Sequence, residues 1–204
     1  MKNSPLANVT SKMLQRGVAA VEFALVAIPF LLLLLGAMEF GRLLYLWNTA
    51  QEMTRNAARQ AVVTDFNDST AIAAIKRSAA FAETDGGFMP GSSEISTANV
   101  VIQYLYVKTN GDVAPVKKMP VSPADNIAAC LDATRLDECI RFVEVCLSTG
   151  TTCDDKSKSI PFKPMIGLFS SSGTNSTDLT GLRIPLSTVR MPAESLGFDP
   201  TLPE

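Results

Sequence analysis

The chain has 204 residues, enough for one ordinary domain and a membrane anchor, and its 18 basic and 20 acidic side chains leave a net charge of −2. It contains no histidine, which excludes histidine-based acid–base catalysis and catalytic triads. No basic cluster is interleaved with aromatic residues, so we expect no nucleic-acid surface. Neither a GxSxG elbow nor a P-loop occurs. We expect a protein that is not an enzyme and holds no cofactor.

An apolar run extends from Val18 to Met38 and contains a single charge, Glu22. At about 1.5 Å per residue, a helix over this run spans about 31 Å, close to the thickness of the hydrocarbon core of a bilayer. A cleaved secretory signal has a shorter apolar region and ends at an A-x-A-like site, which is not found here. We therefore predict a retained transmembrane helix.

The residues before this run carry Lys2, Lys12 and Arg16 and no acidic side chain. Positively charged flanks remain on the cytoplasmic side of a membrane. The N-terminus is therefore expected in the cytoplasm, and the domain after the span is expected in the periplasm or outside the cell.

Four cysteines follow the span, namely Cys130, Cys139, Cys146 and Cys153. Exported domains retain disulfides, whereas the wide spacing and the lack of histidine argue against a zinc site. If Cys139 and Cys146 share an extended strand, they lie about 23 Å apart, too far for a disulfide. Two pairings remain, and Cys130–Cys139 with Cys146–Cys153 is favoured because it closes the shorter loops.

Helical periodicity continues beyond the span to Val63. Its apolar stripe comprises Phe40, Leu43, Trp47, Ala50, Met53, Ala57 and Ala61. Glu39 and Arg42, three residues apart, are expected to pair where the span ends. A second helix is predicted at about Thr70–Glu83, with Asp68 or Ser69 as its N-cap.

The pattern then changes to that of strands and turns. Expected strands cover Asn99–Val107, Val113–Val116, Cys139–Leu147 and Leu182–Met191. Asn110-Gly111 is a hairpin turn signal between the first two, and Pro185 favours an edge position for the last. The predicted fold is α+β: a leader at residues 1–17, a transmembrane and stalk helix at 18–63, and a small disulfide-braced periplasmic head at 64–204, whose sheet packs on the upper stalk.

The sharpest functional signal is the spacing of Gly17 and Glu22. An ionisable residue inside a membrane segment is costly and therefore suggests a function. Removal of residues 1–17 would leave an α-amino group on Val18, one helical turn before the Glu22 carboxylate, so that the two could pair. The alternative is that Gly17 is a spacer and that Glu22 reaches the membrane interface.

The string VEFALVAIPFLLLLLGAMEFGRLLYLWNTAQEMTRNAARQA, together with the preceding glycine, resembles the TadE-like minor pilins of the tight-adherence (Flp) pilus system. In type IV prepilins the same spacing marks peptidase cleavage after the glycine and docking through the glutamate. The resemblance implies processing between Gly17 and Val18, and an assembly role for Glu22 and Phe23. Under it, the amine that pairs with Glu22 belongs either to the same chain or to a neighbouring subunit.

The resemblance further implies a pseudopilin or minor pilin of the bacterial inner membrane that initiates, primes or caps a Flp/Tad adhesion pilus. The implied partners are a prepilin peptidase, other Tad pilins and minor pilins, and the inner-membrane assembly platform. Incorporation into the extracellular filament and retention at the platform both fit the sequence. The alternative function is that of an unprocessed bitopic inner-membrane protein whose periplasmic domain binds a ligand or a partner.

Overall fold

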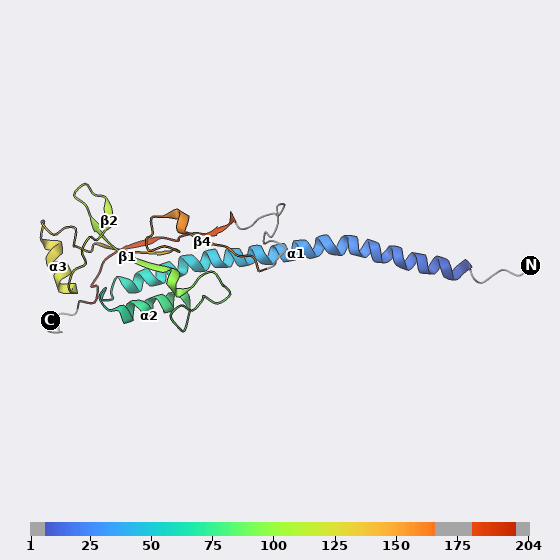
Figure 1. Ribbon diagram of the computed structural model, residues 1–204, viewed down its shortest axis with the longest axis horizontal. Helices are drawn as coiled ribbons and strands as arrows, with labels where there is room; N and C mark the ends of the chain where they lie inside the picture. The colour runs from blue at the N-terminus through green and yellow to red at the C-terminus, as the bar shows by residue number, and fades with distance from the viewer. Residues whose placement is uncertain (1–6, 166–180, 199–204) are drawn as a thin grey trace, which may run out of the picture. The chain divides into compact units, whose positions relative to one another are not determined.

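The structure, a computed structural model, describes residues 7–165 and 181–198, with side chains from residue 18 onward. The chain divides into two compact units, Met1–Leu43 and Leu44–Glu204. The helices are α1 (Ala7–Ala61), α2 (Ser69–Ala80) and α3 (Pro123–Leu131), with short 3-10 turns η1 (Thr97–Asn99) and η2 (Lys156–Lys158). The strands are β1 (Val100–Val107), β2 (Val113–Pro115), β3 (Phe142–Leu147), β4 (Ile160–Pro161), β5 (Arg183–Ile184) and β6 (Val189–Pro192) (Figure 1). A long apolar N-terminal helix followed by a small α+β head confirms the predicted fold class.

Helix α1 begins at Ala7 rather than at Val18, so the predicted leader and span are continuous in secondary structure. The leader residues after Pro5 include lysine, methionine, leucine and glutamine, which favour helix, and no proline interrupts them. Pro29 lies inside the apolar part of the helix, as membrane helices tolerate. The helix ends at Ala61, close to the expected end at Val63.

Residues 44–61 of α1 form part of the head and supply one wall of its core. Their buried apolar side chains are Leu46, Ala50, Met53, Ala57, Ala58 and Ala61. Of the predicted apolar stripe, the head buries the residues from Ala50 onward, whereas Phe40 and Trp47 are 59% and 36% exposed. A helical periodicity of three and four residues fits two neighbouring rows of side chains. Tertiary packing decides which row is buried, and here it is the row that contains Leu46. From Ala50 onward the stripe is buried within the chain's own head and is not available to partner helices.

The main sheet has four antiparallel strands in the order β2-β1-β3-β6. The predicted hairpin at Asn110-Gly111 joins β1 to β2, and Gly111 has the positive φ of +88° that favours glycine. β1 begins at Val100 because Asn99 closes η1, where its side chain accepts a hydrogen bond from the Ser96 backbone N–H. In the register between β1 and β3, Val101 lies opposite Cys146.

The central strand β3 starts at Phe142, three residues later than expected. Before it, the Ile140 N–H donates to the Asn126 side chain at 2.8 Å and Cys139 is joined to Cys130, so this segment is tied to α3. Both faces of β3 are covered, since Val143 is fully buried and Glu144 is 3% exposed. The Glu144 carboxylate is paired with Arg190 of β6, whose Nη2 lies 2.7 Å from Oε1.

The last expected strand is divided into two. β5 pairs with β4 in a separate two-stranded sheet, whereas β6 pairs with β3 at the edge of the main sheet. Pro185 has no N–H to donate and Ser187 has φ +48°, so no regular strand runs through this segment, although the Leu147 N–H still donates to the Leu186 carbonyl at 2.7 Å. The predicted edge position is confirmed for β6.

Helix α2 has the predicted N-cap. The Asp68 carboxylate accepts hydrogen bonds from the N–H groups of Thr70 and Ala71. The helix ends at Ala80 rather than at Glu83, because Phe81 adopts the left-handed conformation with φ +53°. The Ala82 N–H then bonds to the Arg77 carbonyl and closes the last turn.

Candidate functional site

The predicted cleavage position lies in the interior of a helix. Gly17 and Val18 both belong to α1, well beyond its first turn. A peptide bond has to leave a helix before it can enter the active site of a peptidase. Glycine destabilises a helix interior by about 1 kcal/mol relative to alanine, so Gly17 is a weak point at the position where unwinding is needed.

Glu22 and Phe23 are exposed on the same helix, and Phe23 is 75% exposed. Glu22 follows Val18 by one helical turn, so both residues lie on one face of α1. Among the side chains that the structure describes, none forms an ion pair with Glu22. The helix therefore places the candidate processing and assembly residues next to one another and leaves the carboxylate open to another group.

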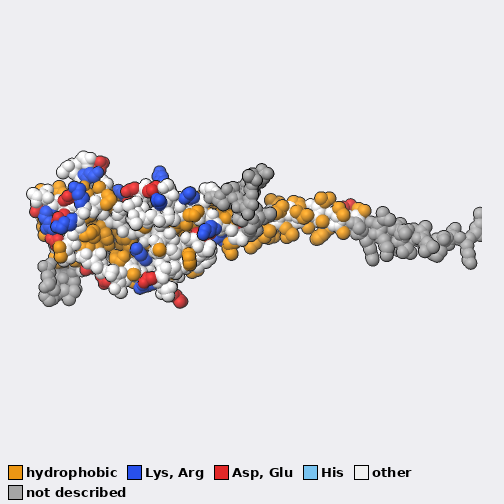
Figure 2. Space-filling view, viewed as in Figure 1, with side chains coloured by type: hydrophobic (Ala, Val, Ile, Leu, Met, Phe, Trp, Pro, Cys, Tyr) orange, Lys and Arg blue, Asp and Glu red, His pale blue; other side chains and the backbone are white. Residues whose placement is uncertain are grey.

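The segment that follows is long and apolar enough to cross a membrane, and within the described residues it is the one helix that meets this test. Its side chains are exposed rather than packed, for example Leu25 at 69%, Val26 at 70% and Leu33 at 76%. Figure 2 shows hydrophobic side chains along this helix and charged side chains over the head. An apolar surface of this extent requires lipid or partner helices, because water does not stabilise it. The helix thus fits association with a membrane.

Glu39 and Arg42 lie near the end of the apolar run. Arg42 Nε is 3.4 Å from Glu39 Oε2, and the glutamate side chain is 5% exposed. The expected pair is present. Charged groups at this position end the stretch that could lie in hydrocarbon.

All four cysteines form disulfides in the head. Cys130 is bonded to Cys139 and Cys146 to Cys153, which is the pairing favoured from the sequence. The second bridge is buried against Val101 in the core. With the thiols used in this way, no three ligand-type side chains in the described part of the chain are placed to hold a metal ion.

Helix α3 was missed by the sequence analysis, although its start carries a recognisable signal. Ser122 is the N-cap, and its Oγ accepts a hydrogen bond from the Asp125 N–H. Pro123 occupies the first turn, where proline favours a helix start. A serine followed by proline and then by an acidic residue could have identified this helix.

The orientation of α3 is unusual for a small helix. It buries Asn126 and Ala129 and exposes Ile127 and Leu131, which are 46% and 84% accessible. Asn126 faces inward because its side chain bonds the backbone N–H of Ile140. A polar residue thus secures the helix to the sheet, and the large apolar residues point outward.

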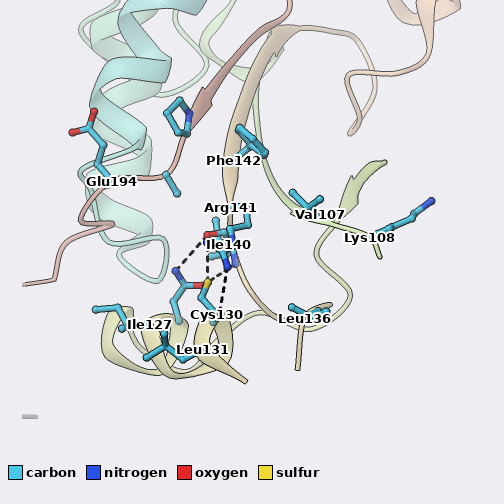
Figure 3. A pocket seen from close by; sticks show the side chains of 13 residues that line it. Val107, Lys108, Ile127, Cys130, Leu131, Leu136, Ile140, Arg141, Phe142 and Glu194 are labelled. Atoms are coloured by element: carbon cyan, nitrogen blue, oxygen red, sulfur yellow. Dashed lines mark hydrogen bonds between the residues drawn. The ribbon is translucent and has the colours of Figure 1, made fainter. Parts of the chain in front are cut away.

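A groove of about 810 Å³ lies between α3, the end of β1 and the segment after β6 (Figure 3). We call it the α3 groove. Its apolar lining includes Val107, Ile127, Leu131, Leu136, Ile140 and Phe142, and its charged residues are Lys108, Arg141 and Glu194. The α3 groove could not be found from the sequence, since its walls come from four separate segments.

Several charged residues around α3, outside the groove, form ion pairs. Arg135 contacts both Asp125 and Glu138, while Lys117 contacts Asp137 and Lys118 contacts Glu138. Hydrogen bonds from Arg135 and then Lys118 lower the pKa of Glu138. A lowered pKa favours the folded state at neutral pH, and this contribution is lost as the pH falls through the range in which the carboxyl is protonated.

Comparison with known proteins connects the N-terminal part of the chain to one family. Residues 17–59 match the family model described as TadE-like protein. The match confirms the resemblance seen in the sequence over this segment. No curated protein and no solved structure gives a significant match to the chain.

Proposed function

We propose that this chain, with its TadE-like segment at residues 17–59, is a minor pilin or pseudopilin that initiates, primes or caps assembly of a Flp/Tad adhesion pilus. It is made as a prepilin, cut after Gly17 by a prepilin peptidase and held in the bacterial inner membrane. Its work is done by packing and pairing, without catalysis and without a cofactor.

One coincidence carries the proposal. The TadE-like match begins at residue 17, the same glycine that precedes the apolar run and lies five residues before its only carboxylate. Neither a passive anchor nor a secretory signal requires that spacing. A prepilin requires both the cleavable glycine and the glutamate.

The charges on the leader support the orientation. Lys2, Lys12 and Arg16 keep the N-terminus in the cytoplasm, where a prepilin peptidase cuts. The head, with its two disulfides, then lies in the periplasm, an oxidising compartment that maintains such bonds.

Cleavage supplies the partner for Glu22. The new α-amino group on Val18 is mostly cationic at pH 7 and can pair with a Glu22 carboxylate, either in the same chain or in a neighbouring subunit. Pairing removes the cost of an unpaired charge in hydrocarbon, so that the helix can enter a bundle of pilin helices. The exposed apolar face of α1 supplies the contact surface with other Tad pilins and with the assembly platform.

Replacement of Glu22 by glutamine tests the assembly role. The variant keeps the size and hydrogen bonding of the side chain but loses its charge. Loss of one partner of a buried pair costs about 3–5 kcal/mol, so we expect pilus formation and co-purification with other pilus proteins to fall by about two orders of magnitude or more. Cleavage should be nearly unaffected, since the scissile bond is flanked by Arg16 and Gly17.

Glu52→Gln is the matched control, because Glu52 is also exposed on α1 but lies in the head unit. This control should leave pilus formation intact. Normal pili and normal co-purification in a correctly processed Glu22→Gln strain would show that Glu22 has no assembly function. The competing assignment, an unprocessed bitopic protein with a periplasmic binding domain, would instead be favoured by a natural chain that is not cleaved after Gly17.

A further inference from the structure

We propose that the α3 groove is a self-association surface, which a second copy of the same chain covers in a two-fold symmetric dimer. The inference rests on the head alone and is independent of cleavage and of membrane insertion.

The apolar part of the surface is large and rigidly presented. Leu131 is 84% exposed, the most exposed large apolar residue among those described in the head, and Ile127 lies one helical turn before it on the same side of α3. Both border a groove of about 810 Å³ whose floor includes Ile140. Exposed apolar side chains that border a hollow are typical of a surface that another protein covers.

The charges of the groove are arranged differently from those around it. Lys108 and Glu194 lie on opposite sides of the groove in Figure 3 and point away from each other. Within residues 7–165 and 181–198, neither forms an ion pair. The neighbouring charges on Arg135, Lys117 and Lys118, in contrast, are all paired within the head.

This arrangement is self-complementary. A two-fold axis that passes through the centre of the groove, between the two rims, places Glu194 of one copy against Lys108 of the other and repeats the contact on the opposite side. Ile127 and Leu131, which border the groove, are then covered by the second copy. A patch with opposite charges on opposite rims meets the requirement of an isologous contact, in which one surface has to match itself.

The groove is also preorganised, which lowers the cost of association. The Cys130–Cys139 disulfide fixes the end of α3, and Asn126 holds it to Ile140 through a buried hydrogen bond. A surface that is already ordered loses little conformational entropy when it binds.

The test measures the molar mass of the full chain in dodecyl maltoside micelles by sedimentation. We expect a dimer for the natural chain. Lys108→Glu and Glu194→Lys each place like charges in both rim contacts, which should weaken dimerisation by about tenfold or more. Both side chains are exposed, so both variants should fold, and retention of the two disulfides checks this.

The decisive arm is an equimolar mixture of the two variants. In a mixed dimer, the lysine introduced at position 194 of one chain faces the glutamate introduced at position 108 of the other. The opposite rim keeps the natural pair of Glu194 and Lys108, so dimers should return. Lys156→Glu and Glu83→Lys, two exposed positions outside the groove, serve as matched controls and should dimerise normally. Leu131→Asp should dissociate the dimer, and mixing it with either charge variant should not restore dimers.

Three results would overturn the proposal. The natural chain could be monomeric at tens of micromolar, which is the range of weak self-association. It could form dimers whose stability is unchanged by every groove substitution, as expected if the transmembrane helix alone causes the association. Finally, the groove variants could abolish binding of a different pilus protein while the natural chain stays monomeric, which would identify a different occupant.

Discussion

Gly17 has two properties that a cleavage position in a helix needs. It lies inside α1, in continuous helical backbone, and glycine has the lowest helix propensity of any residue except proline. Its lack of a side chain also allows close approach of a peptidase to the backbone. The proposed cleavage thus gives a physical reason for glycine at this position.

Replacement of Gly17 by leucine should block processing. A bulky side chain strengthens the helix and hinders the extended backbone that a peptidase must bind. The variant should keep residues 1–17. On a denaturing gel it should therefore migrate as a larger protein than the processed natural chain. Gly41→Leu is the control, because a Cβ at Gly41 meets no atom within 4 Å and the residue is far from the cleavage position in sequence. Equal masses for natural and Gly17→Leu proteins would refute the processing step.

Gly197 and Gly111 allow a matched comparison in the head. Both have positive φ, +83° and +88°, so alanine is strained at either position by about 1 kcal/mol. A Cβ at Gly197 would lie 2.7 Å from the Asp65 backbone nitrogen, whereas none lies within 4 Å at Gly111. We therefore expect Gly197→Ala to cost about 1–3 kcal/mol more than Gly111→Ala in the free energy of unfolding.

Fluorescence of the single tryptophan, Trp47, reports this unfolding, because the residue lies in the part of α1 that belongs to the head. Urea titration of both variants in the same detergent gives the difference directly. Equal midpoints for the two variants would show that Asp65 moves aside at no cost.

At the scale of elements, each disulfide connects a different pair of segments in the head. Cys130–Cys139 connects the end of α3 to the approach to β3, and Cys146–Cys153 connects β3 to the loop before η2. Their sequence separations are 9 and 7 residues, so each closes a short loop within the head. The head therefore depends on cross-links as well as on its small core.

Protein purified without reductant should contain no free thiol when denatured, and four after reduction. Alkylation followed by intact mass measurement counts them. Cys146→Ser/Cys153→Ser should destabilise the head by about 2–4 kcal/mol, since it removes a buried cross-link from the core. Four alkylatable thiols before reduction would contradict both the disulfides and the proposed periplasmic location.

Elements with local signals could be predicted from the sequence. The apolar run indicated the long helix, Asp68 the start of α2, and Asn110-Gly111 the hairpin. Elements whose limits depend on distant partners could not be placed as well. β3 starts late because Asn126 takes the Ile140 N–H, and which apolar residues of α1 are buried depends on the core beside Leu46.

For the whole molecule, the two candidate surfaces differ in how they can be found. The candidate processing and assembly residues lie within seven consecutive positions, 17 to 23, so a motif in the sequence is enough to propose them. The α3 groove is assembled from segments between Val107 and Glu194, and the one signal near it, the helix start at Ser122, gives no indication of a groove. Local sequence therefore predicts the membrane-associated function, whereas the surfaces of the head emerge from the fold alone.

Determination of the N-terminal residue of the protein isolated from bacterial membranes tests the central claim most directly. Edman sequencing, or mass spectrometry of the N-terminal peptide, distinguishes the two forms without any variant. The proposed prepilin gives a mature chain that begins at Val18, with the α-amino group that Glu22 requires. A chain that still begins at Met1 in cells that assemble Tad pili would contradict it.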